Sequence, residues 1–324
     1  MALWTPDLYD PAIWLSSKDE ASVTLASSVV SQWADKSQHG RHAAQGSSSL
    51  RPAYDEDTEG RKRITFSSDQ LDAPAVITGT VARTIYVVAS MATTQSTLIS
   101  QGAVNVDGHQ FNFQGSRTAA GSLNAHTFGG MKETAGEVYT AHTPGIFCAQ
   151  VQQEGTSSQI EFFFNGSPVD SSETQADPAL NTSDSAFRLG NRLTATAYLN
   201  GSIYEVLVFL EEHTAEQRQT VEGYLAHHVA LTGLLPAEHP YKIAAPTYGF
   251  FHGTVIDKDG NPAERRISVL DATGQCVATD TSDPLTGAYE IDMPNDDPYT
   301  LVFDGEPDRN AIVYANVIPE GVPE

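Results

Sequence analysis

The segment 201–231, GSIYEVLVFLEEHTAEQRQTVEGYLAHHVAL, places a strong helix pattern directly after an apolar strand, in a chain whose other segments have the pattern of strands. Thr214 fits the N-cap position, and Gln217 can bond back to the Thr214 backbone, which makes a capping box. Val221 is followed at helical spacing by Tyr224, Leu225 and His228, so these residues lie on one face of a helix. Because only one face is apolar, we predict a peripheral helix at about 214–231 on the outside of a larger body.

The strand before this helix is apolar on both of its faces. Alternation places one set of large side chains on one face, Tyr204, Val206, Val208 and Leu210, and a second set on the other, Ile203, Leu207 and Phe209. A strand with two apolar faces is covered on both sides. We therefore expect the helix to cover one of these faces.

Short apolar strands separated by turn residues occupy the rest of the first 235 residues. Thr84–Ser90 is one such strand, and Phe111 and Phe113 share a face of another. Asn165-Gly166, between the segments 160–164 and 167–169, predicts a hairpin with a type I′ turn, because these two residues accept positive φ angles. Many short strands without βα alternation are typical of a β-sandwich.

The length of 324 residues accommodates two domains of ordinary size. We predict a large sandwich at residues 1–235 and a linker at 236–248, which carries prolines and few bulky apolar residues. Residues 249–324 repeat the strand-and-turn pattern on a smaller scale, with the size and spacing of an immunoglobulin-like sandwich. The predicted fold class is all-β, with one peripheral helix.

The charge balance argues against a nucleic-acid partner. There are 41 acidic and 18 basic residues, and the net charge is −23. A nucleic-acid surface needs clustered Lys and Arg, so we expect no nucleic-acid partner.

No segment approaches the roughly 20 apolar residues of a membrane span, and the N-terminus lacks a signal-peptide pattern, so we expect the protein to be made and to fold in a cytoplasm. Cys148 and Cys276 have neither metal spacing nor a disulfide framework, and we predict that both are buried.

Two acidic features were considered as catalytic sites. Glu290 and Asp292 have the i, i+2 spacing of a glycanase carboxylate pair, but Met293 and Pro294 follow where a second catalytic Glu would be expected. We interpret them as an exposed strand face. Glu205 is a charge inside an apolar strand, and we interpret it as a buried acid held by neighbouring groups. We therefore assign no catalytic residue and expect no enzymatic activity.

Patterns typical of metal sites are as sparse as catalytic ones, and we assign no metal-binding or cofactor-binding residue. The segment 257–261 resembles a calcium loop, but its Gly is fourth where an EF-hand needs it sixth, so a β-turn is the better interpretation. Calcium is the one ion left open, through loop oxygens such as those of Asp35, Asn105 and Asp107. Four histidines were weighed as zinc ligands and interpreted as surface residues: His39, His42, His227 and His228.

The tryptophans Trp4, Trp14 and Trp33 were weighed as a platform on which a sugar ring could stack. Trp4 and Trp14 flank a proline-bearing N-terminal segment. Because a Trp side chain buries a large area, we interpret these residues as core.

Four segments of the first domain resemble the laminin-G or concanavalin A-like jelly-roll modules of bacteriophage structural proteins. They are Trp33-Ala34-Asp35-Lys36-Ser37 with Gly40, His42, Ala43 and Gln45, then Arg51-Pro52, the hairpin Phe162 to Val169, and the strand and helix Gly201 to Leu231.

The second domain resembles the carboxypeptidase-regulatory-like or transthyretin-like sandwiches found at the ends of phage tail proteins. The matching segments are 253–255, 259–263, 286–289, 309–314 and 317–319, although Ala315-Asn316 replaces the acidic residue that often follows Tyr314 in such proteins.

These resemblances imply a non-enzymatic structural component of a phage virion, at the tail tip or baseplate, that also attaches to the host surface. The implied partners are other phage structural proteins, a host-surface glycan and further copies of this chain, for example in a trimer. The alternatives are a carbohydrate-binding adhesin, a capsid decoration or head-fibre protein, and a polysaccharide depolymerase.

Overall fold

The computed structural model describes residues 2–317 except 93–95, 104–105, 117–118, 155–156, 176–178, 194–196, 258, 294–298 and 305–311. The chain forms two compact units. The large unit comprises residues 9–244, and the small unit combines residues 1–8 with residues 245–324. The sequence-based boundary placed the first residues in the large sandwich, whereas the structure pairs Ala2 and Leu3 with the small unit.

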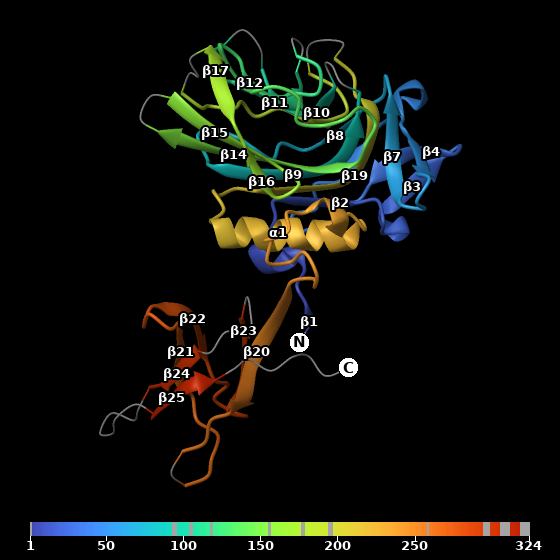
Figure 1. The fold of residues 1–324 in the computed structure, drawn as a ribbon. Coiled ribbons are helices and arrows are strands. Elements are labelled where there is room, and N and C mark those ends of the chain that lie inside the picture. Colours follow the sequence, from blue (N-terminus) through green and yellow to red (C-terminus); the bar gives the residue numbers. More distant parts are fainter. Residues whose placement is uncertain are drawn as a thin grey trace. The chain divides into compact units, whose positions relative to one another are not determined.

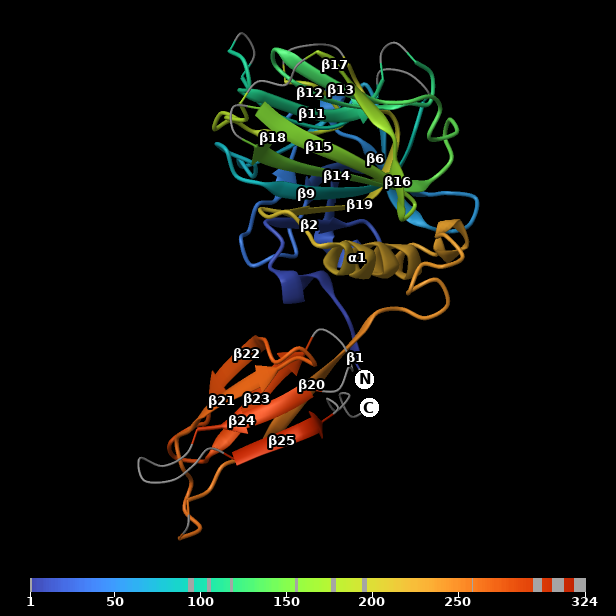
Figure 2. The same cartoon turned by 60° about the vertical axis from the view of Figure 1, so that its left-hand side comes forward.

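The large unit is a continuous antiparallel sheet that folds over into two layers (Figures 1 and 2). The lower layer, which lies nearer the helix in Figure 1, contains β16 (Ser167–Val169), β15 (Ser157–Phe164), β14 (Gly145–Glu154), β9 (Arg83–Met91), β19 (Asn200–Phe209) and β2 (Ile13–Ser16). The upper layer contains β17 (Ser171–Gln175), β13 (Gly130–Thr134), β12 (Leu123–Thr127), β11 (Gln110–Gly115), β10 (Thr97–Gly102), β18 (Phe187–Leu189) and β8 (Leu71–Ala73).

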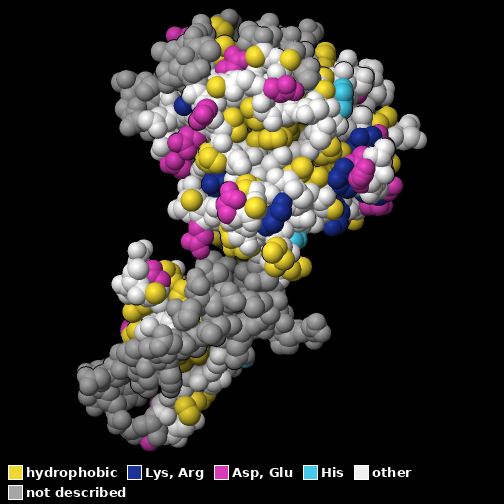
Figure 3. Space-filling model, viewed as in Figure 1, with side chains coloured by type: hydrophobic (Ala, Val, Ile, Leu, Met, Phe, Trp, Pro, Cys, Tyr) yellow, Lys and Arg dark blue, Asp and Glu magenta, His cyan; other side chains and the backbone are white. Residues whose placement is uncertain are grey.

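Shorter strands carry the sheet from one layer to the other. They are β7 (Lys62–Ser67), β6 (Ala53–Glu56), β4 (Val29–Trp33), β3 (Val23–Ala26) and β5 (Ala43–Ala44). Four 3₁₀ turns of the described chain join strands or flank them, at Pro6–Tyr9, Glu20–Ser22, Ser48–Leu50 and Thr232–Leu234. Figure 3 shows Lys and Arg beside Asp and Glu over β3, β4 and β7, where Lys62 pairs with Glu20 and Glu56.

The core of the large unit lies between the two layers and holds the inward side chains of both. Phe111 and Phe113 share one face of β11, as the sequence pattern predicts, and both are fully buried in this core. The alternation in β19 differs from the prediction, because a β-bulge shifts the register between Ile203 and Glu205. Ile203 therefore joins Val206 and Val208 in the core. The strand ends at Phe209, and Leu210 is exposed.

Helix α1 (Ala215–His228) lies against the outside of the lower layer (Figure 1), where it covers β19 as predicted. The predicted capping box is present, since Gln217 N donates to Thr214 Oγ1 at 3.2 Å and Thr214 N donates to Gln217 Oε1 at 2.8 Å. A buried ion pair holds the middle of the helix: Arg218 Nη1 lies 2.8 Å from Glu222 Oε2, and the guanidinium lies 3.9 Å from the centre of the Phe163 ring.

The segment after α1 differs from the predicted free linker in its first half. His227 Nε2 and the Tyr241 carbonyl oxygen lie 2.9 Å apart, and His239 Nε2 lies 3.4 Å from Glu222 Oε2. The Tyr241 side chain also packs against Gly223, where an added Cβ would lie 2.4 Å from the Tyr241 Cβ. Residues up to Ala244 thus belong to the large unit.

The small unit is a two-sheet sandwich. One sheet has the order β1 (Ala2–Leu3), β20 (Thr247–Thr254), β23 (Ala288–Met293), and the other has the order β22 (Cys276–Thr281), β21 (Arg266–Leu270), β24 (Tyr299–Phe303), β25 (Ile312–Val317). Phe251, Ile267, Val269 and Leu301 lie in its core. Cys148 is buried as predicted, but Cys276 is exposed, because it begins the edge strand β22.

The prediction of an all-β chain with a large sandwich, a small sandwich and a peripheral helix is confirmed. The Asn165-Gly166 turn joins β15 to β16 with φ angles of 51° and 83°, as a type I′ turn requires. Among the described residues, no helix is long and apolar enough to cross a membrane.

Replacing Thr214 with Ala should lower the free energy of unfolding of the large unit by ~1 kcal/mol, because the Gln217 amide loses its capping acceptor. Urea denaturation followed by circular dichroism measures this loss. Thr214→Ser is the matched control and should retain most of the stability, since Ser also caps. Equal losses in both variants would show that the hydroxyl is not the stabilising group.

Candidate functional site

The outer side of the upper layer carries a row of polar side chains that crosses neighbouring strands. We call the outer side of β8, β18, β10, β11, β12 and β13 the polar face. Strand pairing places Asp72, Arg188, Ser100, Asn112 and His126 side by side in this row. Ser100 and Asn112 are fully buried, whereas the other three are half-buried. The polar face is therefore shielded in its middle and open to solvent toward both ends of the row.

A second polar row runs parallel to the first. Pairing aligns Thr97, Gln114, Asn124 and Glu133, and all four side chains are buried. Gln114 Nε2 donates to Asn124 Oδ1 at 3.3 Å, and Thr97 Oγ1 donates to Gln114 Oε1 at 3.3 Å. Good hydrogen bonds to oxygen are shorter, at about 2.7–3.2 Å, so these contacts are weak.

Two amide side chains on the polar face have unused hydrogen-bonding capacity. Gln110 is fully buried, and neither its Nε2 nor its Oε1 has a partner among the described residues. Asn112 Oδ1 also has none there, and Asn112 Nδ2 reaches His126 only at 3.4 and 3.5 Å. A buried polar atom without a partner costs ~1–3 kcal/mol. These amides therefore have hydrogen-bonding capacity that a polar group reaching them, such as a buried water, could use.

The charged groups of the polar face are compensated. Arg188 forms two hydrogen bonds with Asp72, from Nε to Oδ1 at 2.7 Å and from Nη2 to Oδ2 at 3.1 Å. Glu133 Oε1 accepts from Ser122 Oγ at 3.1 Å and from Ser116 Oγ. The chemistry of the face is thus that of amides and hydroxyls.

This site was not predicted from the sequence. The sequence feature that marks it is the alternation of polar and core residues in β11, where Gln110, Asn112 and Gln114 alternate with Phe111 and Phe113. Polar residues on the outer side of a strand ordinarily face water, so the sequence pattern does not distinguish a buried polar row from an exposed one.

Glu205 is held by its neighbours, as the sequence interpretation requires. It is fully buried between β19, β2 and α1, and its Oε1 accepts from Trp14 Nε1 at 2.8 Å and from the Tyr224 hydroxyl at 3.1 Å. Its Oε2 lies 3.6 Å from His228 Nε2. Burial raises the pKa of Glu205 to about 7 and lowers the pKa of His228 to about 4.

The carboxylate of Asp35, the first of the residues considered as calcium ligands, is already bonded to donors of its own loop and of β2. Its carboxylate accepts from the backbone amides of Trp14, Ser37 and Arg41, and from Ser37 Oγ. Asp107 lies in a different loop, close to Gly129, and Asn105 lies outside the described residues. Within the described part of the chain, no group of three or more His, Cys, Asp or Glu side chains could hold a metal ion.

The histidines weighed for zinc lie in separate places. His39 lies 3.3 Å from Asp10, and His42 Nδ1 accepts from the Asp35 amide. Both are exposed, as interpreted from the sequence. His227 and His228 are instead half-buried, because Tyr241 and Glu205 lie against them.

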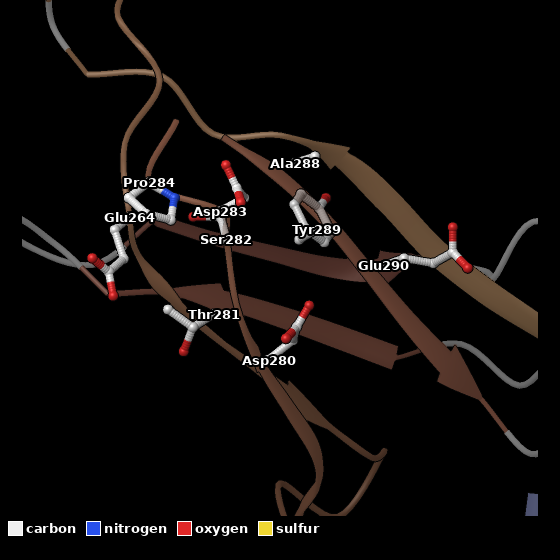
Figure 4. Close-up of a pocket in the computed structure, with 9 residues that line it drawn as sticks. All are labelled: Glu264, Asp280, Thr281, Ser282, Asp283, Pro284, Ala288, Tyr289 and Glu290. Carbon is white, nitrogen blue, oxygen red and sulfur yellow. The ribbon is translucent and has the colours of Figure 1, made fainter. Parts of the chain in front are cut away.

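Glu290 lines an open hollow of about 550 Å³ in the small unit, with Glu264, Asp280 and Asp283 among its other residues. Figure 4 shows the Glu290 side chain pointing away from Asp280 and Asp283. The Asp283 carboxylate accepts from the backbone amides of Leu285 and Thr286, and the bond to Thr286 is the largest cause of its lowered pKa. The side chain of Asp292 lies outside the described residues.

The remaining sequence candidates are structural. Trp4, Trp14 and Trp33 are buried, which agrees with the core interpretation. Asp257 accepts from the amides of Asp259 and Asn261, and Gly260 has a φ of 85°, as in the predicted turn.

No protein-family model and no curated protein matches the chain. Domain 4 of AbnA, a GH43 extracellular arabinanase from Geobacillus stearothermophilus solved in complex with arabinotriose, has a similar structure at 12% identity and a TM-score of 0.46, over 64% of this chain and 96% of that one. The binding domain of Paraclostridial Mosquitocidal Protein 1 is similar at 8% identity and a TM-score of 0.46, over 91% of this chain and 75% of that one.

Trypanosoma rangeli sialidase is similar at 10% identity and a TM-score of 0.44, over 67% of this chain. The match covers 32% of the sialidase, so this chain corresponds to about a third of that enzyme. At such identities the likeness concerns the β-sandwich fold and carries no functional assignment.

The contributions of Glu205 and His228 to the pH dependence of stability should nearly cancel between about pH 4.5 and 6.5, the ordinary pKa values of Glu and His. In this window the unfolded chain holds one proton on His228, and the folded chain holds one on Glu205, so folding changes the number of bound protons little. Lys18, Lys36 and Asp19 also lie near the pair.

Single substitutions should expose the two opposite contributions. In Glu205→Gln, the His228 contribution remains, and stability relative to the wild type should rise as the pH increases from about 4 to 6.5. In His228→Asn, the Glu205 contribution remains, and relative stability should fall as the pH increases from about 4.5 to 7. Urea denaturation at several pH values measures both, and parallel pH profiles for all three proteins would contradict the proton assignment.

Proposed function

We propose that the protein is a non-enzymatic carbohydrate-binding component that attaches a larger particle to a surface glycan. The observation that carries this proposal is the pair of buried amides, Gln110 and Asn112, whose hydrogen-bonding atoms lack partners among the described residues. They lie on a polar face built by neighbouring strands, so rigid elements hold them in place.

Sugar hydroxyl groups are suited to these amides. Each hydroxyl donates and accepts, and an Asn or Gln amide offers a carbonyl oxygen and an NH₂ group in one plane. Pairing with a ligand would remove the ~1–3 kcal/mol cost of each unsatisfied buried atom, so the binding energy includes relief of a cost already present in the free protein.

The absence of catalysis is supported by the state of the carboxylates. Glycoside hydrolysis commonly uses a carboxylic acid and a carboxylate that flank the bond to be cut. On the described part of the polar face, Asp72 is engaged by Arg188 and Glu133 by serine hydroxyls. Incubation with host-surface polysaccharide should release no reducing ends, and release of oligosaccharides would contradict the proposal.

The larger particle we propose is a phage virion, with the protein at the tail tip or baseplate. The support is the resemblance of both domains to phage structural modules, together with a disulfide-free pair of sandwiches. Cryo-electron microscopy of purified particles tests this placement. Density at the tail tip or baseplate would agree with the proposed placement. Density on the capsid would instead indicate a capsid decoration protein, and absence from the particle would overturn the proposed placement.

Replacing Gln110 with Met should weaken glycan binding at least about tenfold, equivalent to ~1.4 kcal/mol. The same change should leave stability unchanged or raise it by ~1–3 kcal/mol, because it removes buried polar atoms that have no partner in the described protein. Glycan-array screening followed by titration calorimetry measures the binding, and urea denaturation measures the stability.

Gln150→Met is the matched control. Gln150 is also a buried amide, but it lies on β14 in the other layer, and its Nε2 donates to the His213 carbonyl oxygen at 2.7 Å. This variant should be less stable and should bind glycan normally. Unimpaired binding by Gln110→Met would place the site elsewhere, and a large loss of its stability would mean that the amide has a structural partner.

A further inference from the structure

We infer that the polar face selects an uncharged glycan and discriminates against sialylated or uronic-acid-containing glycans, an inference that rests on the proposed function. The ion pair between Arg188 and Asp72 and the uncharged amides of the face lead to this selectivity.

The cation within the first polar row is already neutralised. Arg188 pairs with Asp72 through two hydrogen bonds, and the two residues stand on adjacent strands, β18 and β8, at directly opposed positions. This planar two-bond geometry is the one that Arg would otherwise offer to a ligand carboxylate. A sialic acid or uronic acid would therefore have to displace Asp72 and leave that carboxylate without its partner.

The net charge of the chain adds a long-range contribution. The chain as a whole carries a net charge of −23, which repels polyanions at long range. An anionic glycan thus meets a repulsive field as it approaches the protein.

The amides supply the attraction that a neutral glycan requires. Gln110 and Asn112 offer donors and acceptors without formal charge, and the aromatic rings of the same strand, Phe111 and Phe113, point into the core. On the described part of β11, recognition therefore depends on hydrogen bonds to hydroxyl groups, with no aromatic ring available for stacking. Such binding should respond little to ionic strength.

The full-length protein should be titrated with two sets of probes at one fixed pH. One set contains neutral gluco-, galacto- and manno-oligosaccharides, and the other contains sialylated and uronic-acid oligosaccharides. We expect binding to members of the neutral set only, unchanged between about 0.05 M and 0.5 M salt. Binding restricted to the anionic set would overturn this inference and leave the proposed function standing. Binding to neither set would overturn the proposed function.

Asp72→Asn gives the test a second readout, because it removes the carboxylate that neutralises Arg188. This variant should gain affinity for the anionic set by about tenfold, the ratio expected from one charge-assisted hydrogen bond. Asp55→Asn is the matched control, since it breaks the Arg63–Asp55 ion pair on β7 and β6. It should leave the affinities for the neutral set and for the anionic set unchanged. Equal binding of anionic glycans by the wild type and Asp72→Asn would contradict the role of the Asp72–Arg188 pair.

Discussion

The burial of β19 on both of its faces is the constraint on which the large unit depends. One face contributes Ile203, Val206 and Val208 to the core between the layers, and the other lies under α1. The same strand pairs with β9, β2 and β7, so it connects the lower layer to the strands that lead into the upper layer. A one-residue slip would exchange the two faces. The bulge between Ile203 and Glu205 therefore determines which side chains of the strand face the core.

Two buried polar regions lie on opposite sides of this sandwich. Under α1, Arg218 bonds to Glu222, which also lies near His239, and Glu205 Oε1 accepts from Trp14 and Tyr224, while Glu205 Oε2 has no hydrogen-bond partner among the described residues. These groups join the helix to the sheet, so their burial has a structural purpose. On the polar face, Gln110 and Asn112 keep unpaired atoms among the described residues. These unpaired atoms are the ones that the proposed function assigns to a ligand.

Much of the fold could be predicted from local patterns. The capping box at Thr214 and the Asn165-Gly166 turn depend on residues close in sequence, and both are present where the pattern indicates. The errors involve partners that are distant along the chain. Ala2 and Leu3 pair with β20, more than two hundred residues away, and the segment before Ala244 packs on α1 through side-chain contacts that composition does not reveal.

The amino-acid sequence alone determined the fold class, the helix position, the acidic character of the chain and the shared face of Phe111 and Phe113. The tertiary structure decided where the polar side chains meet, because Asp72, Arg188, Ser100, Asn112 and His126 come from strands scattered over more than one hundred residues. Sequence specifies which side of a strand a residue faces. Only strand pairing specifies its neighbours across the sheet, and burial by the rest of the fold decides whether a polar side chain meets water or needs another partner.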